Sequence, residues 1–175
     1  MVGQSKEAKM MKLLYELLKD SSRSDRELGR VMGVSQPTIS RLKKILLEKG
    51  LILGFTIIPD FSKMGYKLLV LTFVKRKTLL ASSEERQKGH EITKKWMSNQ
   101  PNVIFCDYCR GMDMDGFMIS FHKSYEDFDK FIVRHNHDLG YLLKDVQNVL
   151  INIAGNETLK PFHFKYLTEI LNKNN

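Results

Sequence analysis

The sequence predicts an α+β protein with an N-terminal winged helix-turn-helix domain and a C-terminal ferredoxin-like βαββαβ domain. Residues 24–50 carry two helix patterns separated by a tight turn, which is the helix-turn-helix arrangement. Residues 67–153 alternate strand and helix patterns in the order β-α-β-β-α-β. The 175 residues are enough for two such domains, and each half carries an apolar pattern of its own.

The first helix of the helix-turn-helix unit has a clear start and a clear end. Ser24 and Glu27 form a capping-box pattern, so the helix should begin at Asp25. Gly33 predicts its end, because glycine adopts the left-handed conformation without steric cost. We expect Gly29, which has no side chain, to let the two helices cross closely.

The second helix of this unit decides the functional interpretation. Ser35 predicts its N-cap, and Pro37 lies in the first turn, where the missing N–H removes no internal bond. At about 100° per residue, apolar side chains gather on one side, namely Ile39, Leu42, Ile45 and Leu46. The rest of the surface carries the candidate DNA contacts, namely Ser35, Gln36, Pro37, Thr38, Ser40, Arg41, Lys43 and Lys44.

These residue types fit the major groove of double-stranded DNA. Arginine can bond O6 and N7 of guanine together, glutamine can pair with adenine, and lysine holds phosphate or guanine. The alternative is an ordinary helical hairpin with a solvated basic face. We favour DNA binding because the caps, the glycines and the polar outer face coincide within residues 24–50.

The charge of the chain favours the same kind of partner. The net charge is +8 and the sequence pI is about 9.4. Residues 1–60 hold 11 Lys and Arg against 7 Asp and Glu, whereas the remainder holds 17 against 13. The positive charge is therefore denser in the short N-terminal part, as expected for a DNA-contacting module followed by a less charged domain.

The flanking segments complete the predicted domains. Residues 5–20 predict a helix whose apolar stripe closes the helix-turn-helix core. Leu51–Ile58 is an apolar, β-branched run that predicts a strand or short hairpin, and hence the winged variant. The predicted organisation is a DNA-binding domain over 1–60, a hinge over 61–66, a ferredoxin-like domain over 67–155 and a tail of edge strand plus helix over 156–175.

The second half predicts four strands and two helices. The strands are expected at 67–75, 103–110, 117–122 and 147–153, and the helices over about 83–99 and from Ser124 onward. The sequence GMDMDG, residues 111–116, predicts a turn-rich link between the second and third strands. If both helices cover one face of the sheet, the other face stays bare and invites a second copy of the chain.

Several other functions are disfavoured by the sequence. There is no run of 18 apolar residues and no secretory h-region, so we expect a cytoplasmic protein without a membrane span. Cys106 and Cys109 have CxxC spacing, but with no second Cys/His pair we expect two half-buried thiols. The five histidines follow no ligand pattern, and no catalytic motif or phosphate loop is present. We therefore expect no metal, no cofactor and no enzymatic activity.

The segment DRELGRVMGVSQPTISRLKKILLEKGLILGFTIIPDFSKMGY resembles the DNA-binding half of the Lrp/AsnC, or feast/famine, regulators. The second half resembles their RAM domain in element order. The resemblance implies a sequence-specific transcription regulator that binds double-stranded DNA as a homodimer formed through the sheet faces, with tetramers or octamers as larger assemblies. It also implies an amino-acid effector at the turn between the second and third strands, where the candidates are Arg110, Gly111, Asp113 and Asp115.

Three alternatives stay open at this point. The turn at 111–116 is about one residue longer than usual in the family, and it can equally be a plain hairpin with solvated carboxylates. A nucleoid-like architectural protein would bind DNA with little sequence preference. An enzyme or metal-handling protein built on the ferredoxin-like domain is the alternative from another class, and the missing catalytic constellation argues against it.

Overall fold

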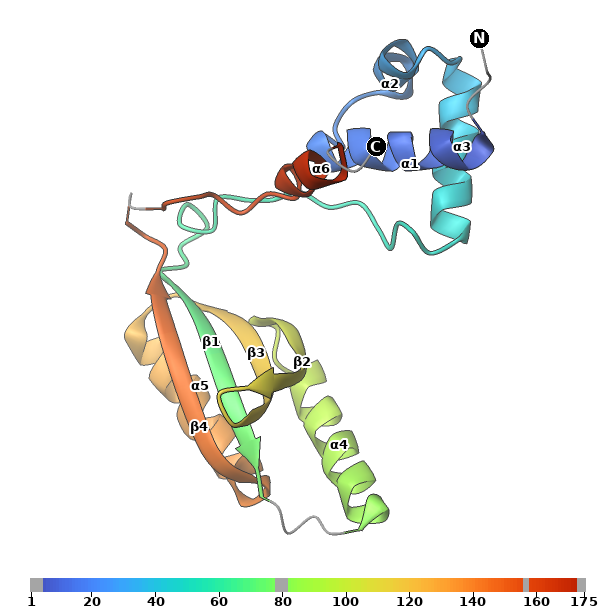
Figure 1. The fold of residues 1–175 in the computed structure, drawn as a ribbon. Coiled ribbons are helices and arrows are strands. Elements are labelled where there is room, and N and C mark those ends of the chain that lie inside the picture. The colour runs from blue at the N-terminus through green and yellow to red at the C-terminus, as the bar shows by residue number, and fades with distance from the viewer. Residues whose placement is uncertain (1–4, 78–81, 156–157, 173–175) are drawn as a thin grey trace. The chain divides into compact units, whose positions relative to one another are not determined.

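The chain folds into two compact units, and it passes between them twice (Figure 1). The computed structural model describes residues 5–77, 82–155 and 158–172. One unit joins Met1–Ile58 to Lys160–Asn175, and the other spans Pro59–Leu159. The predicted α+β class is confirmed, because the N-terminal helices are followed by an antiparallel sheet of βαββαβ order.

The first unit is helical. It contains α1 (Lys6–Lys19), α2 (Asp25–Met32), α3 (Gln36–Glu48) and α6 (Lys165–Asn172). The capping box predicted at the start of α2 is formed, since Ser24 accepts from the backbone N–H of Glu27 and the Glu27 carboxylate accepts from Ser24. Gly33 ends α2 in the left-handed region at φ 68°. Helix α2 therefore begins and ends where these residues predict.

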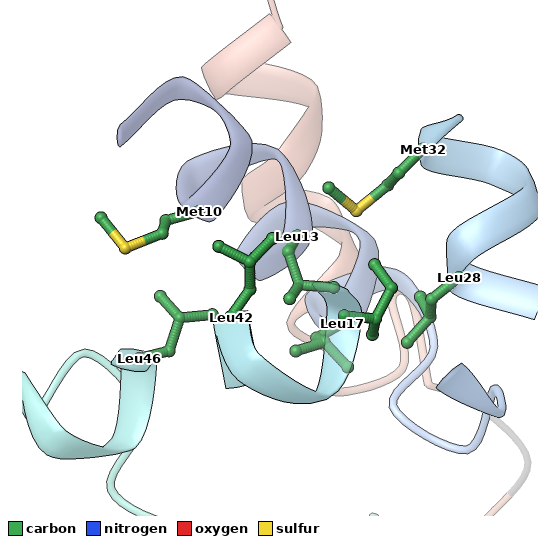
Figure 2. Packing of buried hydrophobic residues seen from close by; sticks show 8 residues of the cluster. Met10, Leu13, Leu17, Leu28, Met32, Leu42 and Leu46 are labelled. Atoms are coloured by element: carbon green, nitrogen blue, oxygen red, sulfur yellow. The ribbon is translucent and has the colours of Figure 1, made fainter. Parts of the chain in front are cut away.

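The core of this unit is a cluster to which three helices contribute (Figure 2). Two helices joined by a tight turn cannot bury their own apolar faces, so α1 supplies the missing layer, and α6 packs against α1. The buried members come from α1, α2 and α3, namely Met10, Leu13, Leu17, Leu28, Met32, Ile39, Leu42 and Leu46.

Two predicted strands are wrong. Residues 51–58 pair with no strand in the described parts of the chain, and Leu53 and Ile57 are 97% and 80% exposed. Residues 158–164 of the tail likewise form no strand, although the terminal helix is confirmed as α6. An apolar, β-branched sequence becomes a strand only beside a neighbour that takes up its backbone hydrogen bonds. The helix-turn-helix therefore stands without the predicted wing strand, and residues 156, 157 and 173–175 of the predicted tail lie outside the described residues.

The second unit is the predicted ferredoxin-like domain. Its elements are β1 (Leu68–Arg76), α4 (Ser83–Ser98), β2 (Val103–Gly111), β3 (Met114–His122), α5 (Tyr125–Leu139), the short 3-10 helix η1 (Gly140–Leu142) and β4 (Leu143–Asn152). The strands lie in the order β2-β3-β1-β4, and every neighbouring pair is antiparallel. This order brings β1, the first strand in sequence, to the inside of the sheet.

The two faces of this sheet differ. On one face, Leu68 and Val70 of β1 are buried against Phe128 of α5, and α4 lies over the same side. The other face carries apolar side chains in register across all four strands, namely Leu69, Leu71, Phe73, Phe105, Phe117, Ile119, Val149 and Ile151. We call this set the open face. Val149 is 50% exposed and Phe105 is 47% exposed, as predicted for a sheet covered by helices on one side only.

The segment predicted as a hinge packs onto the second unit instead. The ring of Phe61 stacks on Phe121 of β3 with centroids 4.1 Å apart, and Tyr66 meets Phe121 edge-on at 5.7 Å. The backbone N–H of Lys67 donates to the carbonyl of His122. Residues 61–66 are thus held by the sheet domain from its first aromatic residue onward.

The turn between β2 and β3 is tighter than predicted. The strands extend to Gly111 and from Met114, which leaves Met112 and Asp113 as a two-residue loop. Both adopt positive φ angles, 53° and 57°, as in a type I′ turn. Glycine or asparagine usually fills these positions, so methionine and aspartate here do not signal so short a loop.

We predict that Gly29→Ala destabilises the helical unit. A Cβ at this position would lie 2.7 Å from the backbone carbonyl oxygen of Val34, in the turn that follows α2. The close neighbour is therefore the turn rather than the body of α3. Alanine raises helix propensity by up to about 1 kcal/mol, but a contact with backbone cannot relax cheaply, so we expect a net loss of roughly 1–3 kcal/mol in denaturant unfolding.

Gly54→Ala is the matched control, because nothing lies within 4 Å of a Cβ there and its φ is not positive. It should change the unfolding free energy by no more than about 0.5 kcal/mol. Equal effects of the two substitutions would contradict the close approach at Gly29.

Candidate nucleic-acid interface

Helix α3 separates its apolar and polar residues onto opposite sides. Ile39, Leu42 and Leu46 are buried in the core. Of the predicted DNA contacts, Thr38 and Lys43 are half-buried, and the exposed ones are Ser35, Gln36, Pro37, Ser40, Arg41 and Lys44. Ser35 is the N-cap residue as predicted, but its hydroxyl is hydrogen-bonded to that of Thr38 and makes no side-chain cap.

Asp25, the first residue of α2, holds two of these side chains. Its carboxylate forms an ion pair with Lys43 at 2.6 Å and accepts a hydrogen bond from the hydroxyl of Ser40. The hydrogen bonds from Lys43 and Ser40 keep the pKa of Asp25 below its ordinary value of 3.8. Because both partners lie on α3, this carboxylate fixes the rotation of α3 against α2.

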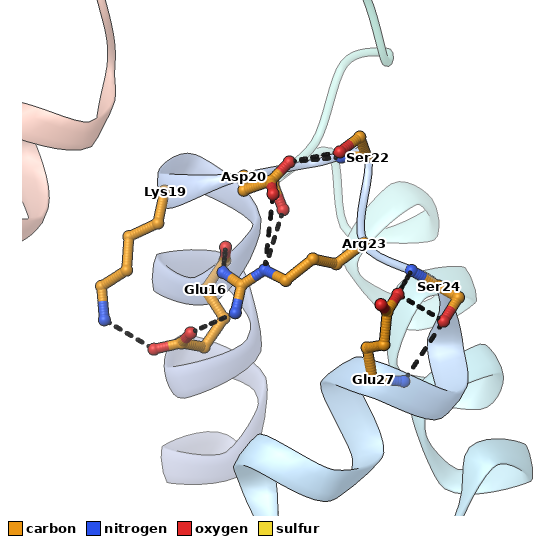
Figure 3. Close-up of polar contacts among 7 residues, drawn as sticks. All are labelled: Glu16, Lys19, Asp20, Ser22, Arg23, Ser24 and Glu27. Atoms are coloured by element: carbon orange, nitrogen blue, oxygen red, sulfur yellow. Dashed lines mark hydrogen bonds and ion pairs between the residues drawn. The ribbon is translucent and has the colours of Figure 1, made fainter.

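A second ionic cluster ties the end of α1 to the turn before α2 (Figure 3). Arg23 donates to the Glu16 carboxylate at 2.9 Å and to the Glu16 carbonyl at 2.6 Å, and Lys19 pairs with the same carboxylate at 2.6 Å. Burial raises the pKa of Glu16, but the hydrogen bonds from Lys19 and Arg23 outweigh it and leave the pKa lowered. The Glu16 carbonyl also accepts the backbone N–H of Asp20, so Arg23 adds a second donor at the C-terminal turn of α1.

Basic residues outside the ion pairs of Asp25 and Glu16 define a candidate anion-binding surface. Within the described part of the chain, Arg26, Arg30 and Arg41 form no ion pair, and all three are exposed. Lys44 lies 3.8 Å from Glu48, but its side chain is 78% exposed. An exposed pair one helical turn apart is weak, so Lys44 can exchange Glu48 for phosphate at little cost.

The predicted effector residues lie on or beside the β2–β3 turn. Asp113 pairs with Lys75 of β1 at 2.6 Å, and Asp115 lies 3.7 Å from the same ammonium group. Hydrogen bonding to Lys75 lowers the pKa of Asp113 and, from the other side, raises the pKa of Lys75. A shallow hollow brings together Arg110 and Asp115, and Gly111 and Asp113 are not part of its lining.

The cysteines and histidines show no sign of a metal site. No group of three potential ligands is close enough to hold an ion anywhere in the described residues. Cys109 is half-buried as predicted, whereas Cys106 is exposed, so the prediction of two half-buried thiols is wrong for Cys106. No helix in the described ranges is long and apolar enough to cross a membrane.

Comparison with known proteins decides the family. No protein-family model matches this chain. The regulator LrpA of Pyrococcus horikoshii, an HTH-type transcriptional regulator, is 33% identical over 96 residues, which are 53% of this chain and 68% of that protein. The chain belongs to the Lrp/AsnC family. It is thus a DNA-binding transcriptional regulator rather than an enzyme.

Solved structures agree with the fold of this Lrp/AsnC regulator. Bacillus subtilis LrpC matches with a TM-score of 0.66 and 22% identity, covering 91% of this chain and 100% of the other. A transcriptional regulator from Neisseria meningitidis, solved in complex with L-Met, matches with a TM-score of 0.72 and 15% identity over 94% and 99%. At these identities the structures establish the fold, which is the one described above.

Two groups that matter for the interface escaped the sequence reasoning. Asp25 was recognised only as the first residue of α2, because its distance in sequence from Ser40 and Lys43 carries no contact signal. Lys75 was assigned only to a strand, and its pairing with Asp113 depends on the β1–β3 register. In both cases the partners come together only after tertiary folding.

We predict that the pairing of Asp25 makes the helical unit sensitive to acid. Its pKa is lower in the folded chain than in the unfolded chain, so its stabilisation is present above pH 3.8 and is lost as the pH falls through the folded-state pKa. Asp25→Asn should lower the unfolding free energy at neutral pH and flatten its decline in acid. Denaturant titrations at a series of pH values test this.

Glu48→Gln is the matched control, because it removes an exposed carboxylate that also pairs with a lysine of α3. A solvent-exposed pair contributes little, so we expect only a small change. An acid profile for Asp25→Asn that coincides with wild type would exclude Asp25 as the anchor of α3.

Proposed function

We propose that this Lrp/AsnC regulator reads specific DNA sequences with α3 in the major groove. The observation that carries the proposal is the separation on α3, which buries Ile39, Leu42 and Leu46 while Arg41 is exposed and outside every ion pair of the described residues. An unpaired guanidinium can meet a guanine edge without first breaking a salt bridge. Gln36, in the first turn of α3, is positioned for a second base contact.

The predicted contact residues have different roles in this proposal. Arg41 and Gln36 read bases, and Lys44 holds a phosphate. Ser40 and Lys43 act by orienting α3, because both are bound to Asp25. Ser35, Pro37 and Thr38 form the N-terminal turn of α3, where backbone N–H groups favour a phosphate.

The open face supports a homodimer. Its apolar side chains come from all four strands, and several remain about half-exposed in a single chain. A contiguous apolar patch of this kind is typical of an interface between subunits, and a two-fold axis lets one face cover its own copy. Two recognition helices would then reach successive major grooves, roughly 34 Å apart. Tetramers or octamers would need a second contact surface.

An amino acid is the proposed effector, at the hollow beside the β2–β3 turn. Arg110 and Asp115 supply opposite charges there, as the carboxylate and ammonium of a zwitterion require. Gly111 and Asp113 would contact the ligand from the turn only after Lys75 releases Asp113. The L-Met complex of the Neisseria protein supports this ligand class, and titration calorimetry with L-Met, comparing wild type with Arg110→Ala, tests it.

The experiment that tests sequence-specific reading is selection of bound sequences from a random DNA pool at physiological salt, followed by footprinting. We expect a pseudo-palindrome with half-sites about one helical turn apart. Tight binding without enrichment of any sequence would favour the architectural alternative, in which affinity depends on backbone charge. Absence of binding would refute the assignment of α3.

Arg41→Ala should cost about 1–3 kcal/mol on the selected site and relax the preference at one position in each half-site. The reason is that its bidentate bonds to one base are lost while the phosphate contacts remain. Binding constants for the selected site and for single-base variants measure both effects. An equal loss on all sequences would make Arg41 a phosphate contact.

Lys44→Ala should instead weaken binding to all sequences and reduce the slope of log K against log salt by about one unit per contacted phosphate. Lys130→Ala is the control, because Lys130 is an exposed lysine of α5 paired with Glu126 in the other unit. An unchanged slope for Lys44→Ala would remove this residue from the interface.

The dimer is tested by placing a charge on the open face. Leu71 lies on β1 between Ile119 and Val149, so Leu71→Asp puts a carboxylate at the centre of the apolar face of both subunits. We expect the dimer dissociation constant in sedimentation equilibrium to rise at least about 100-fold, which corresponds to roughly 3 kcal/mol. Val133→Asp, on the exposed side of α5, is the matched control and should leave the dimer intact.

A further inference from the structure

Helices α4 and α5 enclose a cavity of about 250 Å³ on the inner face of the sheet. Its walls include Gly89 and Thr93 of α4, Thr72 of β1 and Gly116 of β3. Small side chains on both sides leave this space, whereas native interiors rarely contain voids larger than a water molecule. The size lies just below the usual range of ligand pockets, about 300–1,000 Å³, so it fits a small ligand.

The helix above the cavity, α4, is tied to the rest of the domain by a few polar contacts. The indole N–H of Trp96 donates to Asp138 at 2.8 Å, and its ring packs edge-on against His135. Further toward the N-terminus of α4, Gly89 is the only buried residue among those described in this helix. The cavity therefore lies beneath a helix that buries few of its own residues.

The interior of the cavity is apolar and uncharged. Its wall has far more carbon than polar surface, with Met97, Met118 and Leu139 among the lining residues. The hydroxyl of Thr72 is already bound to Asn148 at 2.7 Å. His135 is buried, and burial lowers its pKa, so its ring is neutral at physiological pH. Such walls favour a hydrocarbon group.

The outer edge of the same cavity is cationic. Arg76, Arg86 and Lys94 line it, and none of them forms an ion pair within the described ranges. Asp107 and Asp115 also line it, so the edge keeps a net positive charge. The Asp107 carboxylate accepts the backbone N–H of Tyr108, and the Asp115 carboxylate accepts that of Arg76 and lies near Lys75. Tyr108 closes the edge, with its hydroxyl hydrogen-bonded to His90 at 2.6 Å and the Arg76 guanidinium 5.1 Å from its ring centre.

We propose that this cavity binds a small carboxylate with a branched or aromatic hydrocarbon body. The hydrocarbon body lies between α4 and the sheet, and the carboxylate pairs with Arg76 and Arg86 at the edge. The contacts that hold this ligand are those of its carboxylate and its hydrocarbon body, so it needs no ammonium group. The cavity shares Arg76, Tyr108 and Asp115 with the effector hollow at the β2–β3 turn, but Arg86 lines only the cavity and Arg110 lines only the hollow.

The test uses Cys106, which lines the cavity and is exposed, as a reporter in the full-length Cys109→Ser protein. Phenylacetate and 4-methylpentanoate are the probes, and the rate of Cys106 alkylation by iodoacetamide is followed by mass spectrometry. Protection of about tenfold is expected at ten times the dissociation constant, by mass action. The neutral analogue phenylacetamide should protect much less.

Two pairs of variants locate the bound carboxylate. Arg76→Gln should weaken binding at least tenfold, whereas Arg110→Gln, in the effector hollow, should leave it unchanged. Thr93→Phe should fill the cavity and abolish protection, whereas Thr93→Val, which conserves volume, should not. Because Thr93→Phe can also disturb folding, the arginine pair decides the outcome by itself.

Three results would overturn the proposal. The first is no protection by either carboxylate up to about 10 mM, a concentration that corresponds to only about −3 kcal/mol of binding free energy. The second is equal protection by phenylacetamide. The third is a loss of binding in Arg110→Gln rather than in Arg76→Gln. The last result would move the carboxylate to the turn and support the amino-acid effector instead. DNA binding by the same protein is measured independently and is unaffected by any of these outcomes.

Discussion

The orientation of α3 depends on the close approach between α2 and the turn that follows it. At Gly29 the turn carbonyl of Val34 lies where any side chain would begin, and Gly33 reverses the chain in a left-handed conformation. These two glycines set where α3 starts. Once the start is set, the helical period alone sends Ile39 and Leu42 into the core and Arg41 to the surface. The proposed DNA-reading surface is thus a consequence of backbone packing at a single turn.

Some basic residues of the helical unit are paired with carboxylates, and only the others remain available to DNA. Asp25 binds Lys43, and Glu16 binds Lys19 and Arg23, so three of the cations in the N-terminal unit are structural. The number of Lys and Arg residues in the sequence therefore overstates how many cations DNA can meet. What remains is a smaller set, which includes Arg26, Arg30 and Arg41, whose members form no ion pair in the described residues. Specificity benefits from this selection, because fewer uncommitted cations mean less attraction to every phosphate backbone.

Local signals predicted the elements that are stabilised locally. The capping box of α2, the apolar stripe of α1, the apolar run of β1 and the alternation in β4 specify their own secondary structure, and the βαββαβ order follows from their sequence. The signals failed where structure depends on a partner distant in sequence. Residues 51–58 have the composition of a strand but no neighbour, and Met112 and Asp113 adopt positive φ angles because the β1–β3 and β2–β3 registers close the hairpin around them. For the same reason Asp25 and Lys75 could not be recognised in advance.

The pairing of Lys75 limits how an effector at the turn can act. Asp113 and Asp115 both face this lysine, so an amino acid must offer an ammonium group that competes with an ammonium already in place. Exchange of one cation for another is nearly neutral in energy, and a ligand shifts a conformational equilibrium only by its difference in affinity for the two states. The difference in ligand affinity between the two states must therefore come from the contacts that Lys75 makes after it has left Asp113. Lys75 lies on β1, the strand whose apolar residues run through the middle of the open face. A change in the ion-pair partner of Lys75 would therefore alter the strand at which two copies of the chain are proposed to meet. An effector at the turn would thus act on assembly first, and on DNA binding through assembly.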